Sequence, residues 1–171
     1  MSHLYLNIDR LAQFAAEFSA IVPIVLFVLF YRYQWKPVRL LLLAGYIFAI
    51  LAATVIRPIQ SDNHQIFDLF WSYRNIRVDG IRWQIYINIF LFVPFGFLVP
   101  WAMKCSAFQS IMIGAALSFA IEATQYIFCL GLCELDDVIN NTLGTAIGYW
   151  YWRGLNWIAE KIETAKKGRS I

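Results

Sequence analysis

The chain has 171 residues, of which 60% are hydrophobic, 18% aromatic and only 15% charged, with a formal net charge of +3. This composition is too apolar for a soluble globular domain, and so small a net charge gives no reason to expect a nucleic-acid partner. The apolar runs approach the roughly 20 residues that cross a hydrocarbon core, and they lack the alternation of a transmembrane β-barrel. We therefore expect a single all-α domain, residues 1–171, that forms a polytopic membrane bundle.

Five apolar runs are long enough to cross a membrane as helices. No basic leader with a small-residue cleavage site precedes the first run, so we expect no removed signal peptide. The polar stretch at 58–83 contains several aromatic residues and is expected to rest on the bundle as a short interfacial helix. We expect the spans at about 14–33, 37–57, 85–103, 106–128 and 137–158.

Lysine and arginine are unevenly distributed over the connections between these spans. One side of the membrane would hold nine of them and the other side five, which accounts for all 14. Because short cytoplasmic loops are enriched in these residues, we expect the N-terminus outside the cell and the C-terminus in the cytoplasm.

Glu122 is the most informative polar residue, because a carboxylate inside an apolar helix costs about 2.5 to 3.5 kcal/mol on insertion scales. Such a residue needs a partner and is more typical of a functional pocket than of packing. With the expected topology, Glu122 lies about 9 Å below the outer end of its helix, within reach of a long side chain from above. Arg57 or Arg82 is the expected counter-ion.

Other polar residues would lie at the same depth, near the outer leaflet. Gln125 shares a helical face with Glu122, and Asn88 opens the third span. Each has a simpler interpretation: Asp136 or Asp137 could cap the fifth helix, and Asn141 could be an interhelical hydrogen-bond donor. The expected binding pocket comprises Arg57, Arg82, Asn88, Glu122, Gln125, Asp136, Asp137 and Asn141.

Small residues and a proline mark the faces where helices are expected to pack. Gly144 and Gly148 are four residues apart on the fifth span and would let another backbone approach closely. Gly96 lies on a similar stripe of the third span, where Pro94 opens the hydrogen-bond ladder. These four residues are expected to pack helices rather than to contact a ligand.

Three cysteines raise the question of a disulfide or a metal site. Cys129 and Cys133 are separated by three residues and lie near acidic side chains, but neither histidine is close in sequence. A zinc site would therefore lack its usual four ligands, so we expect no metal. Small apolar fillers are the favoured interpretation of the cysteines, and pairing of Cys129 with Cys133 stays open.

Three segments resemble the VanZ-like family of bacterial membrane proteins, whose founding members are associated with teicoplanin resistance. The segments are NIFLFVPFGFLVP (88–100), SFAIEATQYIF (118–128) and LCELDDVINNTLGTAIGY (132–149). Many relatives also carry an arginine shortly before the acidic pair, where this chain has Leu132-Cys133-Glu134, so Arg82 or Arg57 is the candidate replacement. The family pattern is met by Asn88, Pro94, Gly96, Glu122, Gln125, Asp136, Asp137, Asn141, Gly144 and Gly148.

The resemblance implies a multi-pass protein of the bacterial plasma membrane with a role in the cell envelope. Teicoplanin-type drugs act on lipid-linked cell-wall precursors at the outer face, where the expected pocket would lie. The favoured function is non-enzymatic and needs no cofactor: the pocket engages a membrane lipid, a precursor or a lipoglycopeptide headgroup, with an arginine on its phosphate or carboxylate. The alternative is an integral-membrane enzyme acting on a phospholipid or precursor, with Glu122, Asp136 and Asp137 as metal ligands or acid and base.

Overall fold

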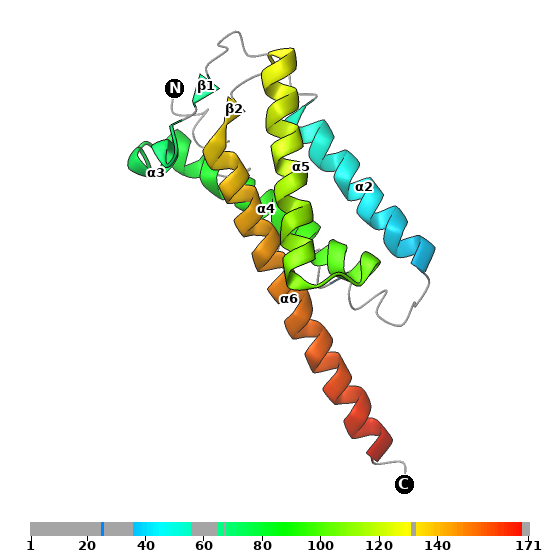
Figure 1. Cartoon of the computed structure of the whole chain (residues 1–171). Helices are drawn as coiled ribbons and strands as arrows, with labels where there is room; N and C mark the ends of the chain where they lie inside the picture. The colour runs from blue at the N-terminus through cyan, green and yellow to red at the C-terminus, as the bar shows by residue number, and fades with distance from the viewer. Residues whose placement is uncertain (1–24, 26–35, 56–64, 67, 131–132, 169–171) are drawn as a thin grey trace.

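The computed structural model describes residue 25 and residues 36–55, 65–66, 68–130 and 133–168. Nearly all of them are helical, as the expected all-α membrane bundle requires (Figure 1). Two short strands, β1 (Gln65–Ile66) and β2 (Cys133–Glu134), pair in parallel. The helices are α2 (Lys36–Thr54), α3 (Trp71–Arg74), α4 (Asp79–Met103), α5 (Ala107–Phe128) and α6 (Leu135–Gly168).

Three of these helices are long and apolar enough to cross a membrane: α2, α4 and α5. They correspond to the spans expected at 37–57, 85–103 and 106–128, although α4 begins at Asp79, earlier than expected. The expected fifth span lies inside α6, which continues into the polar C-terminal tail and is not among those three. The first expected span lies outside the described residues, apart from Val25.

The α4 helix forms the centre of the bundle. Residues 92–102 are all buried, whereas α2 and α5 bury few residues and leave most of their apolar surface exposed. The α4 helix contacts α2, α5 and α6, which surround it. Two prolines lie inside α4, and the Leu91 carbonyl, one turn before Pro94, accepts a hydrogen bond of 2.8 Å from the Tyr46 hydroxyl of α2.

The α4 and α6 helices cross with their backbones in direct contact. A Cβ added to Gly96 would lie 2.1 Å from the Thr145 carbonyl oxygen, and one added to Gly148 would lie 2.0 Å from that of Val93. Gly144 meets α4 in the same way, at the Ile89 carbonyl. Only glycine permits so close an approach, so these residues set the position of α6 against the central helix.

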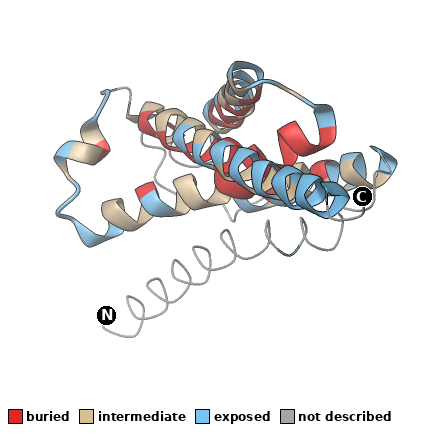
Figure 2. Cartoon of the chain, turned by 90° about the horizontal axis from the view of Figure 1, so that it is seen from below, coloured by how far each residue is buried: buried red, intermediate tan, exposed pale blue. Residues whose placement is uncertain are grey.

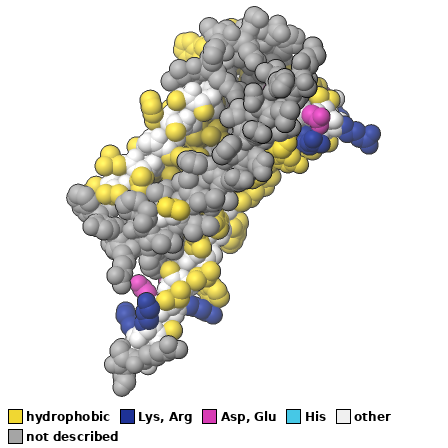
Figure 3. Space-filling model, turned by 180° about the vertical axis from the view of Figure 1, so that it is seen from behind, with side chains coloured by type: hydrophobic (Ala, Val, Ile, Leu, Met, Phe, Trp, Pro, Cys, Tyr) yellow, Lys and Arg dark blue, Asp and Glu magenta, His cyan; other side chains and the backbone are white. Residues whose placement is uncertain are grey.

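The α6 helix is about 51 Å long at 1.5 Å per residue, and its C-terminal part extends beyond the other helices (Figure 1). Its first part is buried against the bundle, and its last part is exposed (Figure 2). Where described side chains are visible in Figure 3, hydrophobic ones cover the middle of the molecule and charged ones gather near its two ends. This distribution is typical of a chain that crosses a membrane.

Candidate functional site

Glu122 lies near the C-terminal end of α5, where its carboxylate is enclosed by the start of α6. The side chain is only 5% exposed, and its Oε2 accepts a hydrogen bond of 3.0 Å from the backbone N–H of Glu134. A backbone amide of the short connection between α5 and α6 therefore supplies the partner that this carboxylate needs.

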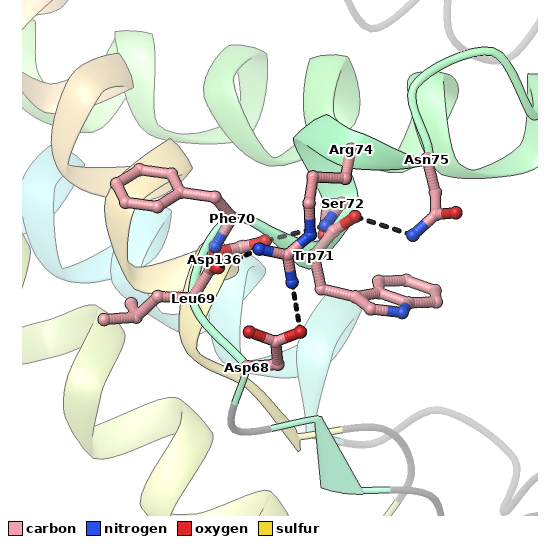
Figure 4. Close-up of polar contacts among 8 residues, drawn as sticks. All are labelled: Asp68, Leu69, Phe70, Trp71, Ser72, Arg74, Asn75 and Asp136. Carbon is pink, nitrogen blue, oxygen red and sulfur yellow. Dashed lines mark hydrogen bonds and ion pairs between the residues drawn. The ribbon is translucent and has the colours of Figure 1, made fainter.

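Asp136, in the first turn of α6, holds α3 against the bundle. Its Oδ1 accepts a hydrogen bond of 2.7 Å from the backbone N–H of Phe70, and its Oδ2 accepts one of 2.8 Å from that of Ser72 (Figure 4). Phe70 has a left-handed backbone with φ of 63°, which turns these amides toward the carboxylate. Asp136 thus caps α3 rather than its own helix.

Arg74 stabilises the same turn from the solvent side. It forms an exposed ion pair with Asp68 and donates a hydrogen bond to the Leu69 carbonyl oxygen (Figure 4). On the inner side, the Tyr73 hydroxyl donates a hydrogen bond to Asn140 of α6. The short helix expected at the interface therefore exists, and side chains of α6 determine where it lies.

Asp137 lies beside the first turns of α4. Gln84 interacts with the carboxylates of both Glu134 and Asp137. The Asn88 amide faces Asp137 without forming a hydrogen bond of normal geometry. We refer to Glu122, Glu134, Asp136 and Asp137 as the carboxylate cluster.

Of the two arginines expected in the pocket, Arg82 does not join the carboxylate cluster. Arg82 pairs with Asp79 at 2.7 Å; the Asp79 side chain is exposed and that of Arg82 is partly exposed. Because α4 begins earlier than expected, Arg82 lies in its first turn, one turn after Asp79, and the expected ion pair with Glu122 is not formed. Arg57 lies outside the described residues.

Two further expected pocket residues form hydrogen bonds between helices. The Gln125 amide donates a hydrogen bond of 3.0 Å to the Thr54 carbonyl oxygen at the end of α2. The Asn141 amide donates one of 2.8 Å to the Ser118 hydroxyl, which joins α6 to α5. Of the two interpretations of Asn141, the structure shows the interhelical hydrogen bond.

A model of the VanZ/LLP1 family matches residues 20–158, which include the whole carboxylate cluster. The chain belongs to the VanZ/LLP1 family. Protein VanZ of Enterococcus faecium is 36% identical over 62 residues, an alignment that covers 36% of this chain and 38% of that protein. No solved structure matches the chain. The resemblance noted in the three sequence segments is thereby confirmed.

Burial is the main influence on the pKa values of Glu134 and Cys133, the two residues of β2 in the VanZ/LLP1 chain. It raises the pKa of Glu134, against hydrogen bonds from Gln84 and Ser72, and the charge of Asp136 raises that pKa further. Burial, with the nearby charge of Glu122, raises the pKa of the Cys133 thiol to about 11. A buried thiol that stays protonated at neutral pH is chemically inert, in line with a packing role for Cys133.

The cysteines are unpaired within the described part of the VanZ/LLP1 chain, where Cys129 is exposed and Cys133 buried. The carboxylates also do not converge as metal ligands: across the described ranges, no group of three or more His, Cys, Asp or Glu side chains has the arrangement to hold an ion.

Three residues of the site were not among those expected from the sequence: Ser72, Gln84 and Glu134. Glu134 and Ser72 hydrogen-bond to each other at 3.3 Å, and Gln84 contacts two of the carboxylates. Gln84 could have been identified from the sequence, because it lies four residues before Asn88 and so shares its helical face. Ser72 could not have been identified in this way, since only the turn held by Asp136 brings it close to α6.

Proposed function

We propose that this VanZ/LLP1 protein lowers the susceptibility of the cell to teicoplanin-type glycopeptides without catalysing a reaction. The carboxylate cluster would engage the headgroup of a lipid, a lipid-linked cell-wall precursor or the drug itself. The observation that carries the proposal is the gathering of four carboxylates at one end of the bundle, none of them ion-paired to a described lysine or arginine.

The chemistry of the cluster favours a ligand that donates hydrogen bonds. Ionised carboxylates only accept hydrogen bonds, and buried ones are stabilised by charge-assisted bonds from hydroxyl, amide or ammonium groups. Among the described residues, Glu122 and Asp136 bind backbone amides, whereas Asp137 faces the side chains of Gln84 and Asn88. Asp137 is therefore the group that we expect to contact sugar hydroxyls or amino groups of the headgroup.

The proposed location is the outer leaflet, where such drugs and their precursor targets meet. The carboxylate cluster lies at the end of the bundle where α5 ends and α6 begins, away from the start of α2, which carries Lys36 and Arg39 (Figure 1). An orientation with the basic end in the cytoplasm would expose the cluster to the outside.

The proposal is tested by measuring accumulation of a fluorescent teicoplanin on cells that express the wild type, Asp137→Asn or Glu122→Gln. Both isosteres keep the side-chain volume and delete the charge, so membrane abundance should stay close to that of the wild type. We expect the wild type to lower accumulation and Asp137→Asn to return it to the level of cells without the protein.

Asp79→Asn is the matched control, because Asp79 is an exposed carboxylate at the start of α4, the end of that helix that carries Gln84 and Asn88. It should protect as well as the wild type. Equal protection by Asp137→Asn, Glu122→Gln and the wild type would remove the cluster from the mechanism. The enzymatic alternative is tested separately with the purified protein, which should leave a labelled phospholipid or precursor unchanged. Turnover that is abolished by Glu122→Gln would show that the protein is an enzyme and not a binding protein.

A further inference from the structure

The short helix α3 lies against the carboxylate cluster and is held there by polar contacts. Of its four residues only Ser72 is buried, and Leu69 and Phe70, which precede it, are exposed. Glu134 and Asp136, on the other side of the contact, are each only 2% exposed. Hydrogen bonds, more than apolar packing, therefore hold α3 in place.

These hydrogen bonds run in one direction, with the α3 segment as the donor. Two of its backbone amides donate to the two oxygens of Asp136 (Figure 4). The Ser72 hydroxyl donates to Glu134 at 3.3 Å, and the Tyr73 hydroxyl donates to the Oδ1 of Asn140. We call the three accepting residues, Glu134, Asp136 and Asn140, the acceptor row.

Asn140 also carries a donor that the described part of the chain does not use. The residue is completely buried, and the Nδ2 of its amide forms no hydrogen bond with any described residue. Burial raises the pKa of Tyr73, and the charges of Asp136 and Asp137 raise it further, which places the Tyr73–Asn140 contact beside both carboxylates. A buried donor without an acceptor is costly, so the Asn140 amide favours a ligand that also accepts a hydrogen bond.

The acceptor row and the Asn140 Nδ2 together select one kind of chemical group. A ligand that uses both must donate hydrogen bonds to Glu134 and Asp136 and accept one from Asn140. A hydroxyl group does both, whereas an ammonium group only donates and an ionised phosphate only accepts. Several neighbouring hydroxyls are present on a sugar, so the donor and acceptor set matches a saccharide.

We infer that α3 occupies the acceptor row in place of a sugar, carried by a glycolipid or by a free saccharide, and that the sugar displaces α3 when it binds. A helix of four residues has little stability of its own, and such segments open locally at small cost. The inference rests on the proposed function, because the acceptor row shares Glu134 and Asp136 with the carboxylate cluster. It adds the class of ligand and the way in which the site opens.

The test is hydrogen exchange of the full-length protein in an amine-oxide detergent, which has no sugar headgroup. The probes are a glucosyl diacylglycerol, free methyl glucoside and phosphatidylethanolamine, whose ammonium group donates but does not accept. The glucosyl lipid should speed exchange in the peptides that contain Phe70 and Ser72, because their amides lose Asp136 as acceptor. Phosphatidylethanolamine should leave the exchange unchanged.

Tyr73→Phe removes one contact of α3 and leaves the acceptor row intact. Because a larger fraction of the molecules is then open, the glucosyl lipid should bind about fivefold more tightly, as measured by native mass spectrometry. Ser72→Ala should act in the same way, and the double variant should gain about 25-fold. The matched control is Tyr86→Phe, the same change at an exposed position of α4, which should bind as the wild type does.

Asn140→Asp tests the donor. The new carboxylate can still accept the Tyr73 hydrogen bond, but it lacks the Nδ2 donor, so the glucosyl lipid should bind about tenfold more weakly. Circular dichroism checks that each variant is folded. If Asn140→Asp does not fold, Tyr73→Phe and Ser72→Ala still decide the outcome.

The two sugar probes distinguish the source of the sugar. Release of α3 by methyl glucoside as well as by the lipid identifies a saccharide site, and release by the lipid alone identifies a glycolipid site. The inference is overturned if neither sugar probe speeds exchange at α3, if phosphatidylethanolamine does so equally, or if Tyr73→Phe binds no more tightly than Tyr86→Phe. Drug exclusion by cells without release of α3 rejects this inference alone, and release of α3 without drug exclusion rejects the proposed function alone.

Discussion

Asp136 shows how one side chain can serve two elements. It lies in the first turn of α6, yet both of its oxygens accept hydrogen bonds from the backbone amides of Phe70 and Ser72. These amides belong to the first turn of α3, which has only four residues and could not form a stable helix alone. The turn at α3 therefore depends on a carboxylate more than 60 residues later in the chain.

Replacing Asp136 by alanine should lower the free energy of unfolding by about 2 to 4 kcal/mol, because two hydrogen bonds to a buried charge are lost. Hydrogen exchange at the Phe70 and Ser72 amides should accelerate together. The measurement is denaturant unfolding in detergent micelles combined with exchange followed by mass spectrometry. Asp79→Ala, which breaks an exposed ion pair, should change stability by less than about 1 kcal/mol; an equal loss in both variants would contradict the assigned role.

Glu134 should make stability depend on pH. Its pKa in the folded chain is raised above the ordinary value of 4.5, first by burial and also by the charge of Asp136. The folded state thus binds this proton more tightly than the unfolded state, so the stabilisation is fully present below pH 4.5 and is lost as pH rises through the folded pKa.

The stability of the wild type relative to Glu134→Gln should therefore increase as the pH falls from neutral toward 4.5. The check is the difference in unfolding free energy between the two proteins, measured over that interval in one detergent. Glu163→Gln, at an exposed position of α6, is the matched control for the removal of a carboxyl group. A flat profile for Glu134→Gln would show that the buried carboxyl does not titrate differently in the two states.

At the scale of elements, the crossing of α4 and α6 decides where the site forms. Asp136 and Asp137 are at the start of α6, and Gln84 and Asn88 are near the start of α4. These residues face each other because Gly96, Gly144 and Gly148 allow the two backbones to touch further along the helices. A shift at the crossing would separate Asp137 from its two amide neighbours.

Gly148→Ala should destabilise the protein by about 1 to 3 kcal/mol, because the new Cβ would lie 2.0 Å from the Val93 carbonyl oxygen and the backbone would have to move. The matched control is Gly154→Ala on the same helix. Nothing lies within 4 Å of a Cβ at Gly154, so alanine should stabilise that position by about 0.5 to 1 kcal/mol. Thermal unfolding followed by circular dichroism measures both changes, and a destabilisation of equal size in the two variants would argue against the close crossing.

At the scale of the whole molecule, the two ends of the described bundle differ in charge. The carboxylate cluster occupies one end, and lysines and arginines are more numerous at the other, where Arg39, Lys104 and Arg153 lie and from which α6 extends further with Lys161, Lys166 and Lys167 (Figure 1). In membrane proteins the end rich in lysine and arginine faces the cytoplasm. This distribution is in line with the proposed orientation, in which the C-terminus is cytoplasmic and the N-terminus, which lies outside the described residues, is outside the cell.

Trypsin should cleave the exposed end of α6 in inverted membrane vesicles and leave it intact in right-side-out vesicles. A second measurement reports on the end of the bundle where α5 ends. A membrane-impermeant maleimide should modify the exposed Cys129 in intact cells, and Cys129→Ser should abolish the labelling. Cys133 should contribute little, since its thiol is buried and its pKa is raised to about 11. Cleavage in right-side-out vesicles without maleimide labelling would reverse the proposed orientation.

The sequence alone determined the class of the protein, three of its apolar spans and its family. These depend on local properties, namely the length of each apolar run and the spacing of residues within one helix. It also identified Glu122 as a group in need of a partner, because the cost of a carboxylate in an apolar helix does not depend on the fold around it.

Only the tertiary structure decided which groups serve as partners. Glu122 binds the backbone amide of Glu134, Arg82 pairs within its own helix instead of with Glu122, and Asp136 caps α3. Sequence spacing describes the faces of each helix, but the choice of partner depends on where the backbones of distant segments lie. That placement is set by the crossing of α4 and α6, where three glycines bring the helices into backbone contact and so determine which polar groups meet.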